Sequence, residues 1–294
     1  MELRPYQTKI ITDTRKSIAS GHKRIIIQAH VGAGKTHISG EIAKLAAQKM
    51  NRTLFIAPRR QLVYQAADKF RDLGSNVGII MAGEQPFGMP FVQVASIDTL
   101  TTRIKNGRIK IPDAAIAICD EAHAVFSMER LNFLKQFPLV IGITATPALA
   151  NGKGMGSFYT DIVEGPTMAE MVDSGYLVPM RYYGADAPDI SAVKLDADGD
   201  YQTKGLAEAS DKPELIGCVY SNYKRLAGDR TTLIFAVNCK HGRHIEEEFN
   251  RHGVAVEYID AHTGTQERAD IERRVASGKT KVIVNVFVMA FGVD

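Results

Sequence analysis

The chain has 294 residues, of which 45% are hydrophobic and 23% charged, a composition typical of folded globular proteins with room for two domains. The formal net charge of +3 is too small to indicate a nucleic-acid partner by itself. The sequence has no apolar run near the roughly 20 residues that span a bilayer, no signal-peptide layout and no Cys-x-x-Cys pair, so we expect a cytoplasmic protein without a zinc site.

Apolar runs alternate with helical patterns through the first half of the chain. Continuous Ile, Val and Ala runs are expected for strands whose two faces are both covered by helices. This alternation predicts a doubly wound α/β domain. In chain order we expect helix 5–20, strand 24–28, helix 36–50, strand 53–57, helix 60–73, strand 77–81, strand 91–95, helix 97–103, strand 114–119, helix 129–137 and strand 139–143.

The pattern changes after residue 147. Residues 151–156 are rich in glycine, residues 176–180 indicate a crossing segment broken by proline, and residues 185–206 indicate an acidic, irregular surface segment. The alternation then resumes with helix 213–227, strand 232–237, helix 241–252, strand 255–259, helix 266–276 and strand 281–287.

The sequence therefore predicts two α/β domains with parallel sheets, one over residues 1–165 and one over residues 166–294. A parallel strand normally leads into a covering helix, and none follows the last strand. We therefore expect the second domain to be incomplete.

A glycine-rich segment, Ala-His-Val-Gly-Ala-Gly-Lys-Thr, joins strand 24–28 to helix 36–50. Small residues between a buried strand and a helix N-terminus let successive backbone N–H groups surround an anion. Lys35 would add positive charge for the β- and γ-phosphates of a nucleotide, and the Thr36 hydroxyl is placed for a magnesium ion. Ala29 stands where this motif usually begins with glycine, and an ordinary surface turn is the alternative. The predicted phosphate-binding residues are Val31, Gly32, Ala33, Gly34, Lys35 and Thr36.

Two acidic residues follow the buried-strand pattern of 114–119. Ligands gather at the carboxyl ends of strands in open α/β sheets, so Asp120 would hold magnesium and Glu121 would polarise the attacking water. His123 would hydrogen-bond toward a neighbouring strand end and report the nucleotide state. The alternative is a helix cap, with Asp120 at the N-cap and Glu121 favouring the helix dipole.

A Thr-Ala-Thr-Pro segment follows the next apolar strand. The hydroxyls of Thr144 and Thr146 would then lie near the same sheet edge as the two acids. We expect these threonines to couple the nucleotide to the second domain, and the alternative is an ordinary turn closed by Pro147.

These motifs occur in the order of the signature of helicase superfamily two, which the chain resembles from residue 3 to residue 294. Within the superfamily it looks most like RadD-type and phage-encoded DEAD/DEAH-box (DExH) helicases. The matching segments are 3–7 for the glutamine motif, 32–36 for motif I, 57–59 for motif Ia, 96–100 for motif Ib, 120–123 for motif II, 144–147 for motif III, 233–238 for motif IV, 263–264 for a threonine–glycine step and 285–294 for motif V.

The resemblance implies roles for residues that the local pattern does not explain. It implies two RecA-like P-loop NTPase domains, ATP and Mg²⁺ as cofactors, and a nucleic-acid partner in a bacterial or phage-infected cell. Single-stranded or duplex DNA is favoured over RNA as that partner, although motors on either nucleic acid share these backbone-contact motifs. Adenine contacts would come from Arg4, Tyr6 and Gln7, nucleic-acid contacts from Arg59, Ser96, Thr99, Asn238, Thr263 and Asn285, and nucleotide contacts from the second domain from Gly292 and Asp294.

The implied activity is an ATP-dependent helicase or translocase that uses hydrolysis to close two domains on a nucleic-acid strand. The alternatives are a translocase subunit of a restriction or remodelling complex and a hydrolysis-deficient, ATP-dependent DNA-binding module. A P-loop small-molecule kinase would explain the phosphate loop but not the second half. The family's motif VI, which carries the arginine finger, has no match here, and Val286 replaces the threonine of many relatives. We therefore expect this chain to bind ATP better than it hydrolyses it.

Overall fold

The computed structural model describes residues 2–84, 88, 90–149, 152–184, 187–196 and 200–289. The chain divides into two compact units, Met1–Met180 and Arg181–Asp294. Each unit has its own sheet, and every strand pair in both sheets is parallel. The predicted parallel α/β fold is therefore confirmed. The last stretch of the first unit, 166–180, is the part that the sequence analysis assigned to the second domain.

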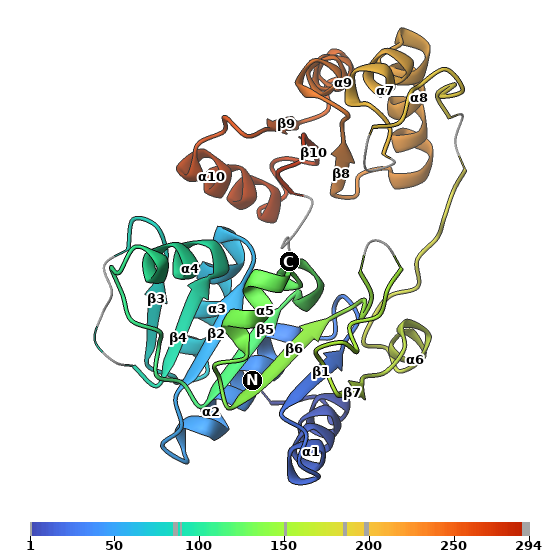
Figure 1. The fold of residues 1–294 in the computed structure, drawn as a ribbon. Helices are drawn as coiled ribbons and strands as arrows, with labels where there is room; N and C mark the ends of the chain where they lie inside the picture. Colours follow the sequence, from blue (N-terminus) through green and yellow to red (C-terminus); the bar gives the residue numbers. More distant parts are fainter. Residues whose placement is uncertain are drawn as a thin grey trace. The chain divides into compact units, whose positions relative to one another are not determined.

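The first unit contains a seven-stranded sheet (Figure 1). Its strands are β1 (Arg24–Gln28), β2 (Thr53–Ala57), β3 (Val77–Ile80), β4 (Val92–Ser96), β5 (Ile116–Asp120), β6 (Leu139–Thr144) and β7 (Asp161–Glu164). Its helices are α1 (Pro5–Ala19), α2 (Lys35–Ala47), α3 (Arg60–Asp72), α4 (Ile97–Lys105), the short 3₁₀ helix η1 (Ala122–Val125), α5 (Met128–Leu134) and α6 (Met168–Asp173). The strand order β3-β4-β2-β5-β6-β1-β7 places β1 and β5 on either side of β6.

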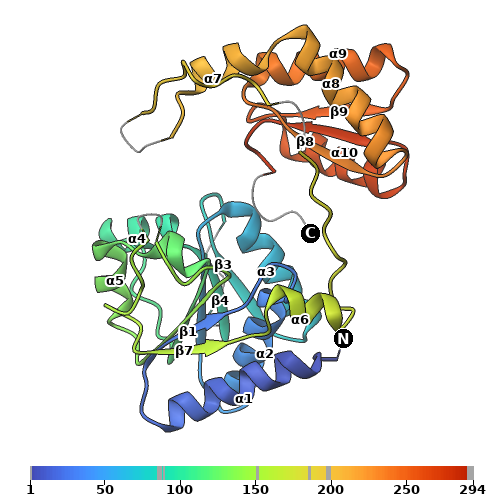
Figure 2. The same ribbon diagram turned by 90° about the vertical axis from the view of Figure 1, so that its right-hand side faces the viewer.

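Helices cover both faces of this sheet (Figure 2). On one face α1, α2 and α3 pack against the strands, and the rings of Phe55 and Phe70 meet edge to face with centroids 5.0 Å apart. On the other face α4 and α5 bury Leu100 and Leu134. Burial on both sides explains why the central strands are continuous apolar runs. None of the helices within the described ranges is both long and apolar enough to cross a membrane.

The second unit has a three-stranded sheet in the order β8-β10-β9. One face is covered by α8 and α9, where Phe249 is fully buried, and the other by α10 through Ile271. The strands are β8 (Thr232–Phe235), β9 (Val256–Ile259) and β10 (Val282–Asn285), and the helices are α7 (Thr203–Ser210), α8 (Pro213–Asn222), the π-helical turn η2 (Tyr223–Ala227), α9 (Cys239–Arg251) and α10 (Thr265–Ala276).

The elements β7, α6 and α7 differ from the sequence expectation. β7 pairs only with β1 at the sheet edge, and its four residues bury Val163 while Ile162 is 44% exposed, so it lacks the apolar run that marked the central strands. The short helix α6 was also missed. α7 begins inside segment 185–206, which we expected to be irregular. The expectation was wrong for residues 203–206, because this helix buries Ala207 and Ala209 just beyond the acidic stretch.

Candidate nucleotide-binding site

The loop after β1 forms a cradle that only glycine can line at two positions. Gly32 and Gly34 have φ values of +80° and +76°, which L-residues with side chains rarely adopt. A Cβ added to Gly32 would lie 2.7 Å from Leu177 Cδ2, and one added to Gly34 would lie 2.5 Å from Gln7 Nε2. The loop leads directly into α2, whose first N–H groups have no partner within the helix. This arrangement suits an anion such as a phosphate.

The strand register brings the other predicted site residues to the level of this loop. Gln28, the last residue of β1, pairs with Thr144 at the end of β6, and Asp120 at the end of β5 pairs with Ile143. Three predicted parts of the site therefore lie at neighbouring strand ends on the carboxyl edge of one sheet, where ligands bind in this class of fold. They are the phosphate-binding loop of residues 29–36 (the P-loop), the acids Asp120 and Glu121, and Thr144.

Lys35 and Glu121 form an ion pair across this edge. Lys35 Nζ lies 2.5 Å from Glu121 Oε1, and both side chains are mostly buried, 15% and 25% exposed. Glu121 has a φ of +44°, a conformation that costs energy for a non-glycine residue and is found disproportionately at functional sites. The segment thus aims this carboxylate at the P-loop, as the convergence of the two motifs predicted.

Asp120 is the most buried carboxylate of the site. Its side chain is 7% exposed, and Oδ1 accepts a hydrogen bond from the Glu121 N–H at 3.0 Å. The pKa of Asp120 is raised to about 6, chiefly by burial and next by the nearby charge of Glu121, while the Lys35 charge and the hydrogen bond from the Glu121 N–H act in the opposite direction. A bound divalent cation would offset this desolvation. The helix-cap alternative was wrong, because η1 has Glu121 at its N-cap and no side-chain cap.

His123 connects the acids to the threonine segment. Its Nδ1 lies 2.8 Å from Thr144 Oγ1 and 3.6 Å from Glu121 Oε2. The Thr144 hydroxyl donates to the Thr146 carbonyl and accepts from the Thr146 N–H, both at 3.1 Å. A hydroxyl has one proton, and that of Thr144 is used in the bond to the Thr146 carbonyl. The hydrogen bond between His123 and Thr144 therefore requires the tautomer in which Nδ1 of His123 is the donor. The hydrogen bond to a neighbouring strand end that we expected for His123 is present.

The residues of the predicted glutamine motif gather on the P-loop carbonyl of Ala33. The buried Gln7 donates from Nε2 to Ala33 O at 3.0 Å, and its Oε1 accepts from the Arg4 N–H at 2.9 Å. The Tyr6 hydroxyl also donates to Ala33 O, at 3.1 Å, and accepts from Arg4 Nη1 at 3.1 Å. Their contact with adenine stays a prediction, but Tyr6 and Gln7 are hydrogen-bonded to the loop that would hold the phosphates, and Arg4 is hydrogen-bonded to both of them.

Two residues that the sequence analysis did not assign also contact this region. The Tyr176 ring meets the Tyr6 ring edge to face, with centroids 5.1 Å apart, and Leu177 lies against Gly32. The sequence offered no motif for them, since segment 176–180 was predicted only as a crossing between domains.

The predicted nucleic-acid contacts of the first unit lie at the carboxyl ends of neighbouring strands. Arg59 is the N-cap residue of α3 just after β2, and Ser96 ends β4 opposite Ala57. Thr99 lies in the first turn of α4, where its hydroxyl contacts Met81 Sδ at 3.8 Å. Arg59 and Ser96 thus share the sheet edge with the P-loop.

In the second unit the predicted contacts are engaged in local structure. Asn238 caps α9 by accepting the His241 N–H at 2.8 Å, and the Thr263 hydroxyl accepts the Asp260 N–H at 3.0 Å. Asn285 is fully buried, and its Oδ1 accepts two N–H groups of the loop after β10. Its nucleic-acid role stays a prediction. Gly292 and Asp294 lie outside the described residues.

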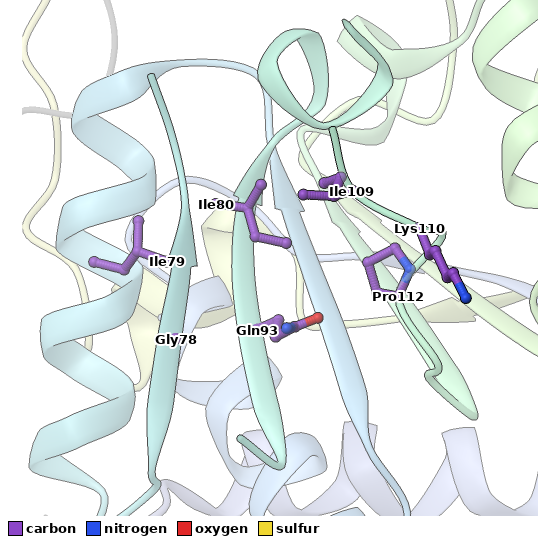
Figure 3. A pocket seen from close by; sticks show the side chains of 7 residues that line it. All are labelled: Gly78, Ile79, Ile80, Gln93, Ile109, Lys110 and Pro112. Atoms are coloured by element: carbon purple, nitrogen blue, oxygen red, sulfur yellow. The ribbon is translucent and has the colours of Figure 1, made fainter. Parts of the chain in front are cut away.

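Two pockets in the described part of the chain lie away from this site. A cavity of about 90 Å³ is lined by β3, β4 and residues 109–112 (Figure 3), and a groove of about 650 Å³ runs between α1, α2 and the amino ends of β5 and β6. Neither is lined by P-loop residues or by the acids, so neither is the nucleotide site.

Comparisons with known proteins agree with this geometry. Residues 1–149 match the family model "Type III restriction enzyme, res subunit". The chain is 28% identical over 273 residues to the "51.5 kDa protein" of a Lactococcus phage (isolate 7-9), covering 92% of this chain and 56% of the relative. It is 26% identical over 314 residues to the "Putative ATP-dependent helicase IRC3" of Saccharomyces cerevisiae, covering 99% and 45%. The chain thus spans about half the length of these curated relatives.

Solved structures share the fold at low sequence identity. The restriction-modification enzyme LlaBIII bound to DNA superposes with a TM-score of 0.68 at 13% identity, covering 100% of this chain and 25% of that one. S. cerevisiae Dbp5 bound to RNA and ADP BeF3 gives 0.57 at 15% identity, covering 99% and 76%. These two likenesses establish the architecture alone.

Proposed function

Because the chain belongs to the type III restriction enzyme res subunit family and is a DExH-type superfamily two protein, we propose that it is the motor part of an ATP-dependent DNA translocase or helicase. The observation that carries this proposal is the 2.5 Å ion pair between Lys35 and Glu121. It brings a phosphate-binding cation and a water-activating acid to one point at the carboxyl edge of the sheet, as nucleotide hydrolysis requires.

The residues present suit ATP and magnesium. The positive φ angles of Gly32 and Gly34 let the loop curl around an anion, and α2 begins directly after it at Lys35. Thr36 lies in the first turn of α2 and Asp120 is buried at the end of β5, so their oxygen atoms would hold the metal. Bound magnesium would supply positive charge that stabilises the phosphates during transfer. Glu121 would orient and deprotonate the attacking water, with Lys35 drawn to the phosphates.

Nucleic acid would bind beside the nucleotide. Arg59 and Ser96 follow β2 and β4, and β2 pairs with β5, which carries the acids. We favour phosphate contacts by these residues, which fix a strand in place without reading its sequence. DNA is favoured over RNA because the matching family is named for a restriction enzyme, whereas both LlaBIII with DNA and Dbp5 with RNA share the fold.

The test is nucleic-acid-stimulated ATP hydrolysis by the full-length protein. We expect hydrolysis to rise with single-stranded DNA, to rise less with RNA, and to be lost in Lys35→Ala. Lys49→Ala is the matched control, since Lys49 is an exposed lysine beyond the far end of the same helix. Hydrolysis that persists in Lys35→Ala, or that does not respond to nucleic acid, would refute the proposal.

A second candidate is a restriction motor that moves along duplex DNA without separating its strands. The family match favours it. The two candidates differ in their products: a helicase releases a labelled strand from a forked duplex, whereas this motor displaces a triplex-forming strand from intact duplex and leaves the fork paired. ATP-dependent DNA binding without hydrolysis would instead indicate the binding module.

A further inference from the structure

The segment after α6 is fixed to the core of the first unit. Gly175, with a φ of +71°, turns the chain, and the N–H groups of Tyr176 and Leu177 both donate to the Met171 carbonyl, at 2.8 and 3.0 Å. The Met171 side chain is fully buried in the core that α1 and α2 share. Tyr176 and Leu177 are therefore held in place by backbone bonds, independently of what their side chains contact.

The Tyr176 side chain packs on the residues expected to contact the base. Its ring meets the Tyr6 ring at 5.1 Å with an interplanar angle of 70°, and the Arg4 guanidinium carbon lies 5.1 Å from its centroid. Both are favourable geometries for an aromatic pair and a cation–π contact. Because the Arg4 side chain is hydrogen-bonded to the Tyr6 hydroxyl, contact with Tyr176 limits the movement of both side chains together.

Leu177 packs on the phosphate side of the same site. Its Cδ2 lies where a Cβ of Gly32 would otherwise point, so the leucine side chain packs against the P-loop at this glycine. Consecutive residues thus contact the two parts of the nucleotide site, Tyr176 beside the base contacts and Leu177 beside the phosphate loop.

We infer that Tyr176 and Leu177 are positioning residues of the nucleotide site, with Tyr176 acting through Arg4 and Tyr6 on recognition of the base and Leu177 acting through Gly32 on the phosphates. This inference rests on the proposed binding of ATP. Tyr176 makes the site select a nucleotide carrying a base over a bare triphosphate. Leu177, which packs on the phosphate loop, strengthens the binding of the nucleotide and of the bare triphosphate alike.

Only Val178, Pro179 and Met180 separate this pair from Arg181, where the second unit begins. The start of the connection between the units is therefore in contact with both halves of the nucleotide site. If ATP binding moved Arg4, Tyr6 or the P-loop, Tyr176 and Leu177 would have to move with them, and so would the residues that begin this connection.

The test compares the binding of ATP with that of inorganic tripolyphosphate, each with magnesium, by equilibrium titration of the full-length protein. Tyr176→Ala is expected to weaken ATP binding about tenfold, from loss of the ring and cation–π contacts, and to leave tripolyphosphate binding unchanged. Tyr176→Phe keeps the ring and is expected to bind both ligands like the wild type. Leu177→Ala is expected to weaken both ligands, and Leu177→Met to restore them.

Tyr183→Ala is the matched control, because Tyr183 is an exposed tyrosine outside the first unit. Circular dichroism of each variant identifies any loss of folding. Tyr176→Leu, which keeps an apolar side chain but removes the ring, carries the comparison if the alanine variant unfolds. Equal loss of ATP and tripolyphosphate binding in Tyr176→Ala, or no loss, would overturn the role of Tyr176. Failure of the wild type to bind ATP would instead overturn the proposed function.

Discussion

Lys35, the first residue of α2, and Glu121, directly after β5, are ion-paired at 2.5 Å; the strands β1 and β5 that precede them are separated only by β6. A lysine carries one positive charge, so the phosphates of a nucleotide and the Glu121 carboxylate compete for it. While Lys35 is paired with it, Oε1 of Glu121 is engaged by the lysine and is not available to a water molecule. We expect phosphate binding to draw Lys35 away and thereby to free Glu121 to accept a proton from water.

Replacing Glu121 by glutamine should separate binding from hydrolysis. Glu121→Gln removes the competing charge, so ATP should bind as tightly as in the wild type or more tightly. Hydrolysis should fall by about 10²-fold or more, because the general base is lost. Equilibrium titration with ATP and single-turnover hydrolysis measure the two quantities separately.

Glu129→Gln, an exposed glutamate in the first turn of α5, is the control for a change of charge alone and should alter neither quantity. The competition described above would be refuted if Glu121→Gln lost ATP affinity as strongly as Lys35→Ala, since the carboxylate would then be holding the loop together.

The P-loop glycines allow backbone strain and steric overlap to be distinguished. Gly34→Ala and Gly74→Ala both place a Cβ at positive φ, which costs about 1–2 kcal/mol. Gly74 has open space around it, whereas a Cβ at Gly34 would meet the Gln7 amide, which two hydrogen bonds hold in place. Thermal denaturation should show both variants destabilised, and nucleotide titration should show weakened ATP binding in Gly34→Ala alone. Wild-type ATP affinity in Gly34→Ala would show that the loop tolerates displacement of Gln7.

The strands of the first unit could be predicted well because burial imposes a clear pattern. The bounds predicted for β1 and β2 are those observed, since each is an apolar run that ends at a polar residue or a turn. β7 could not be found this way, because an edge strand has one covered face and needs only Val163 to be buried. Its place in the sheet depends on β1, not on its own residues.

The candidate site shows the same division. Lys35 and Glu121 could be placed together because parallel strands end at one edge, so sequence motifs and sheet geometry suffice. Tyr176 and Leu177 could not, because their contacts with Tyr6 and Gly32 join distant segments that share no motif. The burial of Asn285 at the end of β10 could not be predicted either, because nothing in the neighbouring sequence distinguishes this fully buried asparagine from an exposed one.

The second unit should lose stability in acid through Glu257. Its Oε1 accepts hydrogen bonds from Arg274 Nε at 2.6 Å and Thr280 Oγ1 at 3.1 Å. The bond from Arg274 holds the pKa of Glu257 below its ordinary value of 4.5, although burial opposes this. A lowered folded-state pKa stabilises the fold above pH 4.5 and loses this contribution as the pH falls through the folded-state value.

Urea unfolding followed by circular dichroism measures this contribution. Glu257→Gln should lower the midpoint slightly at pH 7, because solvent screens a partly exposed pair, and the difference from the wild type should shrink toward pH 3. Glu247→Gln, an exposed glutamate on α9, should show no such pH-dependent difference. A deficit that is the same at both pH values would mean that the hydrogen bonds to Glu257 do not depend on its charge.

Loss of the imidazole at position 123 should uncouple hydrolysis from nucleic acid while sparing the nucleotide. His123 joins Glu121 to Thr144, and Thr144 is fully buried at the end of β6. In His123→Ala the ATP affinity should stay the same, because no phosphate-loop residue is changed, and stimulation of hydrolysis by single-stranded DNA should fall about tenfold, the size of a typical coupling free energy. Thr144→Val removes the other partner of the same hydrogen bond and should give a similar loss, whereas Thr144→Ser keeps the hydroxyl and should restore stimulation. If His123→Ala and Thr144→Val had additive effects in the double variant, the two side chains would act separately and the hydrogen bond between them would not carry the coupling.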